Sequence, residues 1–270
     1  MSFYTSLNGL KNAQSELSVI SNNLANAETT GFKKSRINFA DIVSGSASTN
    51  PRLVKGIGST VQTVDQDFSL GAIQQTGSAL DLAINGEGFF TKVSPITGKT
   101  FYTRNGNFVM DGSGYITDST GNRLRVLPVD AAGNVTSTTP IDAQAPLVNG
   151  AGADFLAVTV KQDGSIQAAY SDGTSAVIGK VALASFVAPS GLLQVGGQDW
   201  LATGMSGAAS YNQPGAARSG TILSGSLEQS NVDIAEEMVG LITAQRYFQA
   251  NAKAIDTATQ LSQTIINLRS

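Results

Sequence analysis

The chain has 270 residues, a formal net charge of −3 at pH 7 and 41% hydrophobic residues. This length and apolar content suffice for one large or two modest folded domains. The negative charge argues against nucleic acid as the main partner, because proteins that bind nucleic acid carry an excess of lysine and arginine. Charged residues make up only 14% of the chain, against roughly 25% in ordinary soluble proteins, so we expect a neutral, polar surface.

The chain contains no cysteine and no histidine. Disulfides, zinc–thiolate sites, cysteine nucleophiles and Ser-His-Asp triads are therefore excluded. The remaining polar residues form no recognisable catalytic, metal-binding or cofactor-binding pattern, so we expect neither an enzyme nor a cofactor. No apolar run approaches the ~18 residues of a membrane helix, and the N-terminus lacks the basic and apolar regions of a secretory signal. We expect no membrane insertion.

Residues 1–30 predict an N-terminal assembly helix that spans residues 3–26. The glycine of Thr29-Thr30-Gly31 is typical of a helix stop. Apolar residues recur in this segment in steps of three and four, which places them on one face of a helix. They are Phe3, Leu7, Leu10, Ala13, Leu17, Ile20 and Leu24.

Residues 226–270 predict a longer C-terminal assembly helix over residues 232–268, with Ser230, Asn231 or Asp233 as its N-cap. Two isolated helices cannot bury such long apolar stripes, so we expect another chain to cover them. A helical hairpin packed on the β domain of a monomer is the alternative. The second stripe consists of Ile234, Met238, Leu241, Phe248, Ala252, Ile255, Ala258, Leu261, Ile265 and Leu268.

Residues 31–225 predict a central, mainly antiparallel β domain, so that the whole chain has an α+β fold. Short apolar runs indicate strands, of which residues 181–187 form the last strong one. The dipeptide Asn85-Gly86 predicts a hairpin, and so do the turns at Asp111-Gly112, Asp163-Gly164 and Asp172-Gly173. Residues 130–155 hold few bulky apolar side chains and are predicted to be a linker.

The polar clusters of the chain give no strong site. Lys33, Lys34 and Arg36 form a small basic cluster that we expect on a solvated face or in salt bridges to a neighbouring subunit. The segment from Asp111 to Gly114 begins like a calcium loop, but the later acidic positions are missing. A simple hairpin turn is the better interpretation.

Four stretches carry a more specific signal. They are ISNNLANAETTGFK at residues 20–33, ALDLAINGEGFF at residues 79–90, YTRNGNF at residues 102–108, and SNVDIAEEMV at residues 230–239. In this order they resemble the N-terminal, middle and C-terminal motifs of the bacterial flagellar rod and hook family. The resemblance spans nearly the whole chain.

Within this family three segments resemble the hook type: residues 1–3, Phe39-Ala40-Asp41 and residues 266–269. Residues 42–57 also lack the longer insertion that distal rod proteins tend to carry. Hook proteins usually insert an outer domain near residues 130–155, where this chain has only a linker-like stretch. The length of 270 residues is close to that of a rod protein, so the rod alternative stays open.

The resemblance implies a structural subunit of the flagellar hook or basal body that is exported by the flagellar type III apparatus and works outside the cell. It implies a helical homopolymer in which coiled-coil-like terminal helices pair and line a tube, while the β domain lies outside. The tube would transmit torque from rod to filament. Other expected partners are the rod, the hook–filament junction, the hook cap and the export apparatus. A monomeric adhesion module with a helical stalk is a more remote alternative.

The residues that we expect to carry subunit assembly come from both helices. They are Leu7, Leu10, Leu17, Ile20, Leu24, Ile234, Met238, Leu241, Phe248, Ile255, Leu261, Ile265 and Leu268.

Overall fold

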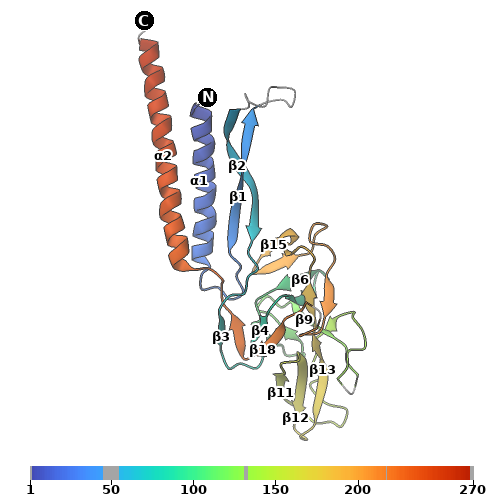
Figure 1. Cartoon of the computed structure of the whole chain (residues 1–270). Helices are drawn as coiled ribbons and strands as arrows, with labels where there is room; N and C mark the ends of the chain where they lie inside the picture. The colour runs from blue at the N-terminus through green and yellow to red at the C-terminus, as the bar shows by residue number, and fades with distance from the viewer. Residues whose placement is uncertain (1, 45–54, 131–132, 217, 268–270) are drawn as a thin grey trace. The chain divides into compact units, whose positions relative to one another are not determined.

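The structure is a computed structural model that describes residues 2–44, 55–130, 133–216 and 218–267 (Figure 1). Two long helices and a mostly antiparallel set of strands make it an α+β protein, as the sequence predicted. The chain divides into two compact units. Unit 1 comprises Met1–Ala27, Lys34–Asp67 and Val232–Ser270, and unit 2 comprises Glu28–Lys33 and Phe68–Asn231.

Unit 1 is built from both chain termini and one long hairpin (Figure 1). Its helices are α1 (Ser2–Ala25) and α2 (Ile234–Asn267), close to the predicted bounds. Its hairpin consists of β1 (Ser35–Ser44) and β2 (Lys55–Gln66), which pair antiparallel and pack against α1. The sequence had placed this hairpin in the central β domain, whereas the structure groups it with the helices.

The ends of the helices follow from local chemistry. Asp233 is the N-cap of α2, since its Oδ1 accepts hydrogen bonds from the amides of Ala235 at 2.8 Å and Glu236 at 3.2 Å. This settles which of the three predicted candidates caps the helix. After α1, Gly31 has a φ of 70°. A Cβ at Gly31 would lie 2.5 Å from the backbone nitrogen of Asn105, so only glycine fits there.

Unit 2 holds a short 3₁₀ helix, η2 (Pro189–Gly191), and the remaining strands, all paired antiparallel. The main sheet runs in the order β11-β12-β13-β9-β5-β6-β16-β15, while β18 pairs with β4 and β19 pairs with β3. The strands are β3 (Ile73–Gln75), β4 (Leu82–Asn85), β5 (Phe89–Val93), β6 (Thr100–Thr103), β7 (Val109–Met110), β8 (Ile116–Thr117), β9 (Arg123–Leu127), β10 (Ile141–Asp142), β11 (Phe155–Val160), β12 (Ser165–Tyr170), β13 (Ser175–Val181), β14 (Leu183–Ser185), β15 (Leu193–Gly196), β16 (Asp199–Leu201), β17 (Ser210–Asn212), β18 (Thr221–Ser224) and β19 (Ser226–Glu228).

Two apolar clusters form the core of unit 2. The larger one gathers aliphatic and aromatic side chains from most strands, with Leu82, Phe90 and Ile166 among its fully buried members. The smaller one is aromatic and centres on Phe89 and Trp200, whose ring centroids lie 5.8 Å apart at an interplanar angle of 63°. Edge-to-face packing of this kind is favoured by the ring quadrupoles.

The predicted turns were partly confirmed. Hairpins form at Asp111-Gly112 between β7 and β8, at Asp163-Gly164 between β11 and β12, and at Asp172-Gly173 between β12 and β13. The hairpin predicted at Asn85-Gly86 is wrong, because β4 pairs with β18 and β5 pairs with β6. A Cβ at Gly86 would lie 2.9 Å from the Cα of Gly220, so this glycine permits close backbone approach.

The prediction that residues 130–155 form a linker is wrong for the middle of that segment. Ala143 and Ala145 are fully buried in the larger core. The amide of Ala143 donates to the carbonyl of Leu124 at 2.9 Å, and that of Ala145 donates to Gly114 at 2.8 Å. Small side chains fit where backbones approach closely, so a search for bulky apolar residues overlooks such packing.

The sequence also underestimated the end of unit 2. Residues 181–187 were predicted to be the last strong strand, yet β15 to β19 follow them. These strands have only three or four residues each, which is too short for a clear alternation of apolar and polar residues. Their stability comes from partners distant in sequence, which a local pattern does not reveal.

Candidate assembly surface

The helices α1 and α2 lie side by side in opposite directions (Figure 1). Near one end, a Cβ at Gly9 would come within 2.6 Å of the Asn251 side chain. Near the other, the Nδ2 of Asn23 donates to Glu237 at 3.3 Å. These two pairs establish the antiparallel direction.

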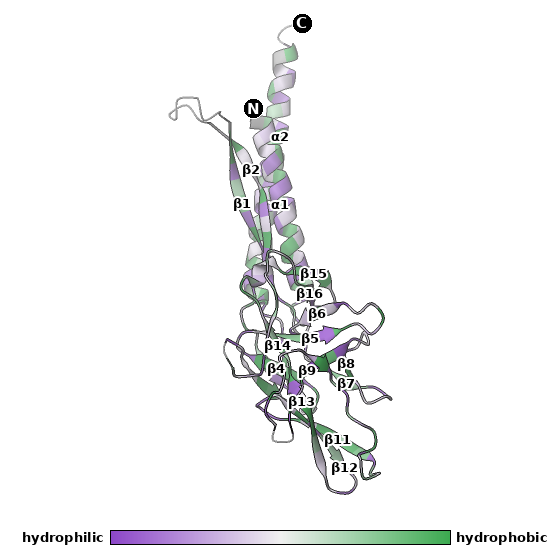
Figure 2. Cartoon of the chain, turned by 90° about the vertical axis from the view of Figure 1, so that its right-hand side faces the viewer, coloured by the Kyte–Doolittle hydropathy of each residue, from purple (hydrophilic) through white to green (hydrophobic). Residues whose placement is uncertain are grey.

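The covered face of α2 follows a regular spacing. Its half-buried or buried positions alternate in steps of four and three, as in a helix that packs along one partner. They are Glu237, Leu241, Ala244, Phe248, Asn251, Ile255 and Ala258, with Gly240 and Ala252 half-buried beside them. Figure 2 shows green hydrophobic segments interspersed with white and purple ones along this helix.

The predicted assembly residues fall into two groups in this chain. Ile20 is buried, and seven are half-buried, namely Leu7, Leu10, Leu17, Leu24, Leu241, Phe248 and Ile255. Three are exposed, namely Ile234, Met238 and Leu261. Leu268 and the side chain of Ile265 lie outside the described residues.

Two exposed apolar residues beside Met238 on α2 were not among the predicted assembly residues. Val239 is 66% exposed and Ile242 is 51% exposed, next to Met238 at 48%. Met238 and Ile242 are four residues apart and therefore neighbours on the helix surface. This four-residue spacing is present in the sequence, but the longer apolar stripe that faces α1 is the stronger pattern.

The C-terminal turns of α2 extend beyond the start of α1 (Figure 1). Gly9 lies against Asn251, and α1 begins seven residues before Gly9, at Ser2. The overlap of the antiparallel helices therefore ends at about residue 258 of α2. Leu261 and Ile266 lie past that point and are 65% and 67% exposed. No described residue of α1 is placed to cover them.

Asn23 fixes the register within unit 1. Its side chain is 2% exposed. The Nδ2 donates to the carbonyl of Ser35 at 2.9 Å, while the Oδ1 accepts from the amide of Ser35 at 2.9 Å. Together with the bond to Glu237, this one amide joins α1 to β1 and α2. Removing it would leave buried polar groups unpaired.

A buried ionic cluster lies in unit 2. The Nζ of Lys33 lies 2.5 Å from the Oε1 of Glu228, and both side chains are fully buried. Arg104 approaches the other carboxylate oxygen at 3.3 Å and donates to the carbonyl of Gly86 at 2.9 Å. The amide of Gly71 also donates to Glu228 at 3.0 Å. The expectation of a solvated or intersubunit Lys33 is therefore wrong, because Glu228 supplies a buried counter-charge.

Electrostatics explain why this cluster needs its carboxylate. Burial lowers the pKa of Arg104 from its ordinary value, and the charges of Glu228 and Glu87 oppose that shift. One carboxylate pairs with two buried cations, so its loss would remove this counter-charge from both Lys33 and Arg104. Lys33 directly precedes the return of the chain to unit 1, and Glu228 lies just before the second return at Val232.

A second buried group of charges joins strands in unit 2. Lys92 forms ion pairs with Asp118 and with Asp199, the latter at 2.7 Å. Burial raises the pKa of Asp199. For Asp118 burial acts in the same direction, but hydrogen bonds from Lys92 and Thr120 outweigh it and lower the pKa. Within the described residues we find no group of three or more potential ligands that could hold a metal ion.

Three protein-family profiles match the chain. The profile of flagella basal body rod proteins covers residues 3–33, that of the flagellar hook protein FlgE/F/G D1 domain covers residues 83–168, and that of the flagellar basal body rod FlgEFG protein C-terminal covers residues 223–268. In the part of the chain that the structure describes, no helix is long and apolar enough to cross a membrane.

Relatives align over nearly the whole chain. The chain is 38% identical over 280 residues to the flagellar basal-body rod protein FlgG of Bacillus subtilis, and this alignment covers 99% of the chain and 98% of that protein. The chain belongs to the flagellar rod and hook protein family. It is also 34% identical over 281 residues to FlgG of Caulobacter vibrioides, covering 98% of each, and 25% identical over 411 residues to the flagellar hook protein FlgE of Salmonella typhimurium, covering 100% of each.

Membership of the rod and hook family makes the chain an axial structural subunit of the flagellum. The buried ionic cluster draws one residue from each matched segment of this family. Lys33 lies in the first, Arg104 in the second and Glu228 in the third. The three matched segments thus meet in space, and the cluster gives a physical reason for the charged residues at these three positions.

Proposed function

We propose that this axial subunit polymerises into the tubular hook, with α1 and α2 of many copies around the channel and unit 2 on the outside. The observation that carries the proposal is the apolar surface that stays exposed after α1 and α2 have paired. Met238, Val239 and Ile242 form one part of it, and Leu261 and Ile266 form the other. Contiguous exposed apolar residues on a helix mark a surface that another chain covers.

The predicted assembly residues take two roles in this proposal. The half-buried ones, such as Leu17 and Leu241, hold α1 and α2 together as a coiled-coil-like pair. The exposed ones, Ile234, Met238 and Leu261, contact other copies in the tube. The proposal keeps the N-terminal assembly helix, the central β domain and the C-terminal assembly helix expected from the sequence. It adds the β1–β2 hairpin to the assembly part.

The mechanical task and the export route are part of the same proposal and are suggested by the resemblance to the rod and hook family. The proposed tube transmits torque from the rod to the filament, and the subunit leaves the cell through the flagellar type III apparatus. Its further partners are the rod, the hook–filament junction and the hook cap. The absence of cysteine supports this route, since no disulfide has to be kept reduced before export.

A rod subunit is the second candidate. It is favoured by the 38% identity to the Bacillus subtilis rod protein over almost equal lengths, against 25% identity to the Salmonella typhimurium hook protein. The hook is favoured by residues 1–3, Phe39-Ala40-Asp41 and residues 266–269, and by the short segment 42–57. Tubes that curve indicate a hook, and tubes that stay straight indicate a rod.

The test of assembly uses the purified full chain, sedimentation and electron microscopy of the pellet. We expect tubes from the wild type and few or none from Met238→Glu, because a carboxylate in a dry interface costs several kcal/mol. Gln245→Glu, at another exposed position of α2, is the matched control and should assemble normally. Normal tubes from Met238→Glu would contradict the proposed face, and a wild-type chain that stays monomeric would contradict the proposed function.

A further inference from the structure

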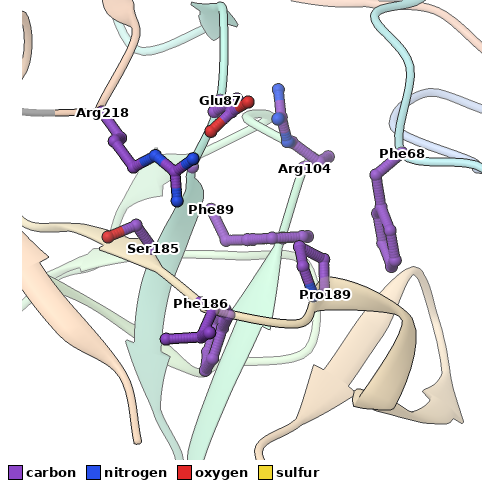
Figure 3. A pocket seen from close by; sticks show the side chains of 10 residues that line it. Phe68, Glu87, Phe89, Arg104, Ser185, Phe186, Pro189 and Arg218 are labelled. Atoms are coloured by element: carbon purple, nitrogen blue, oxygen red, sulfur yellow. The ribbon is translucent and has the colours of Figure 1, made fainter. Parts of the chain in front are cut away.

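Unit 2 contains a cavity of about 240 Å³ that opens to the surface (Figure 3). Its floor is aromatic, with Phe68, Phe89 and Phe186 close to one another in the view. Phe89 packs edge-to-face on both other rings, at centroid distances of 5.2 Å and 5.8 Å. Val187 also lines the cavity and is 87% exposed. An aromatic floor with an exposed apolar rim favours an apolar side chain as its occupant.

The polar residues of the cavity are mainly cationic. Figure 3 shows the guanidinium of Arg218 directed toward the space above Phe89. Arg218 is exposed and forms no hydrogen bond or ion pair with any described residue. Arg104 lines the same cavity, stacks on Phe89 at 5.3 Å, and has a buried Nε without a hydrogen-bond partner among the described residues.

The local charge balance favours a negatively charged partner. Two arginines, Arg104 and Arg218, line the cavity together with one carboxylate, Glu87. Glu228 is fully buried and already engaged by Lys33 and Arg104. The cavity therefore presents an aromatic floor and an unneutralised arginine to a ligand.

One exposed segment of this same chain has the complementary chemistry. Along β1, Phe39 and Val43 are 40% and 53% exposed, and Asp41 between them is exposed as well. The intervening Ala40 and Ile42 are half-buried. Asp41 forms no hydrogen bond or ion pair with any described residue. Alternate strand residues lie roughly 6.5–7 Å apart on the same face, so the carboxylate of Asp41 lies close to an apolar side chain on either side.

We propose that this cavity receives the Phe39–Asp41–Val43 face of β1 from a second copy of the chain. An apolar side chain of that face enters the aromatic floor, and the carboxylate of Asp41 pairs with Arg218. This inference rests on the proposed polymer and names one of its intersubunit contacts. It also gives a role to the Phe39-Ala40-Asp41 segment, which the sequence had singled out without a mechanism.

Chemical cross-linking tests the contact without requiring tubes. Because the chain has no cysteine, an Ala40→Cys copy and a Ser185→Cys copy each carry a single thiol beside the contact and keep both Asp41 and Arg218. A mixture of the two, treated with a short bismaleimide, should give covalent heterodimers at least about tenfold faster than a mixture of Ala40→Cys with Lys99→Cys, where Lys99 is also exposed in unit 2. Equal rates in the two mixtures would overturn the proposal.

Charge reversal tests the same contact during assembly. Arg218→Glu and Asp41→Arg should each raise the critical concentration for tube formation about tenfold, which corresponds to about 1.4 kcal/mol. Lys99→Glu should leave it unchanged. An equal mixture of the two single variants should assemble like the wild type, because each pocket can then receive an oppositely charged strand from the other variant. Rescue in the double variant but not in the mixture would mean that the strand comes from the same copy, which overturns the proposal.

Lysine substitutions at two exposed apolar residues test whether the rim of the cavity matters more than any other exposed apolar position. Val187→Lys should impair assembly, whereas Ile96→Lys, at a residue that is 93% exposed elsewhere in unit 2, should not. The two proposals also fail separately. Wild-type tubes without the specific cross-link would refute this contact and keep the proposed function. The specific cross-link without wild-type tubes would support the contact and refute the proposed function.

Discussion

Glu228→Gln should destabilise unit 2 strongly. The substitution keeps the size of the side chain but removes the carboxylate that lies within hydrogen-bonding distance of both Lys33 and Arg104, at 2.5 Å and 3.3 Å. All three side chains are at most 3% exposed, so water cannot replace the lost charge. Breaking a buried ion pair by removing one partner costs about 3–5 kcal/mol.

This loss is a large part of the stability of a domain, which is typically about 5–15 kcal/mol. The measurement is urea unfolding at pH 7, followed by the fluorescence of Trp200. Trp200 is the one tryptophan of the chain and is buried in unit 2, so its signal reports on that unit. The midpoint should fall by more than 1 M urea, given a slope of about 1–3 kcal/mol per M.

Glu87→Gln is the matched control for this prediction. Glu87 is exposed and makes no side-chain hydrogen bond or ion pair with a described residue, so its neutralisation should cost less than about 0.5 kcal/mol. A Glu228→Gln chain that unfolds within 1 kcal/mol of the wild type would refute the reasoning, since the carboxylate would then not be needed to neutralise the two cations.

Three other predictions concern other parts of the chain. Leu241→Asp should weaken the α1–α2 pair by several kcal/mol and reduce the helical signal in circular dichroism, because the residue lies on the face that packs against α1; unchanged helicity would contradict that packing. A short epitope inserted between Gly150 and Ala151 should leave Trp200 fluorescence and tube formation intact, since a Cβ at Gly150 would meet nothing within 4 Å; loss of tubes would place this turn in an interface. Asp118→Asn should lower the urea midpoint at pH 7. The pKa of Asp118 is lowered in the folded chain, so its ionised form stabilises the fold above the ordinary carboxyl pKa, and the difference from the wild type should fade as the pH drops below about 4. A difference that persists unchanged in acid would argue against the ion pair with Lys92.

The parts of the fold that were predicted well depend on local rules. Both helices have a long apolar periodicity, a polar cap or a glycine stop, and their bounds matched to within a few residues. The turns at Asp163-Gly164 and Asp172-Gly173 connect adjacent strands of one sheet, so local turn chemistry was sufficient to predict them.

The parts that were missed depend on partners far away in the sequence. Asn85-Gly86 has the residues of a hairpin, but β4 finds its partner in β18. Ala143 and Ala145 complete the core through their backbone hydrogen bonds and small size rather than through bulk. No local pattern distinguishes them from the residues of a flexible loop.

The candidate site shows the same division. The stripe of α2 was visible from spacing, but only the structure separates the covered Leu241 from the exposed Met238. Lys33 looked like one member of a solvated basic cluster, and its counter-ion Glu228 lies 195 positions away. A buried lysine cannot be recognised from sequence alone unless its distant carboxylate is known.

An electron-microscopic reconstruction of the tubes formed by the purified chain tests the central claim most directly. The account predicts that α1 and α2 line the channel and that Met238 and Ile242 contact a second copy. Tubes in which unit 2 lines the channel, or in which Met238 and Ile242 face solvent, would contradict it.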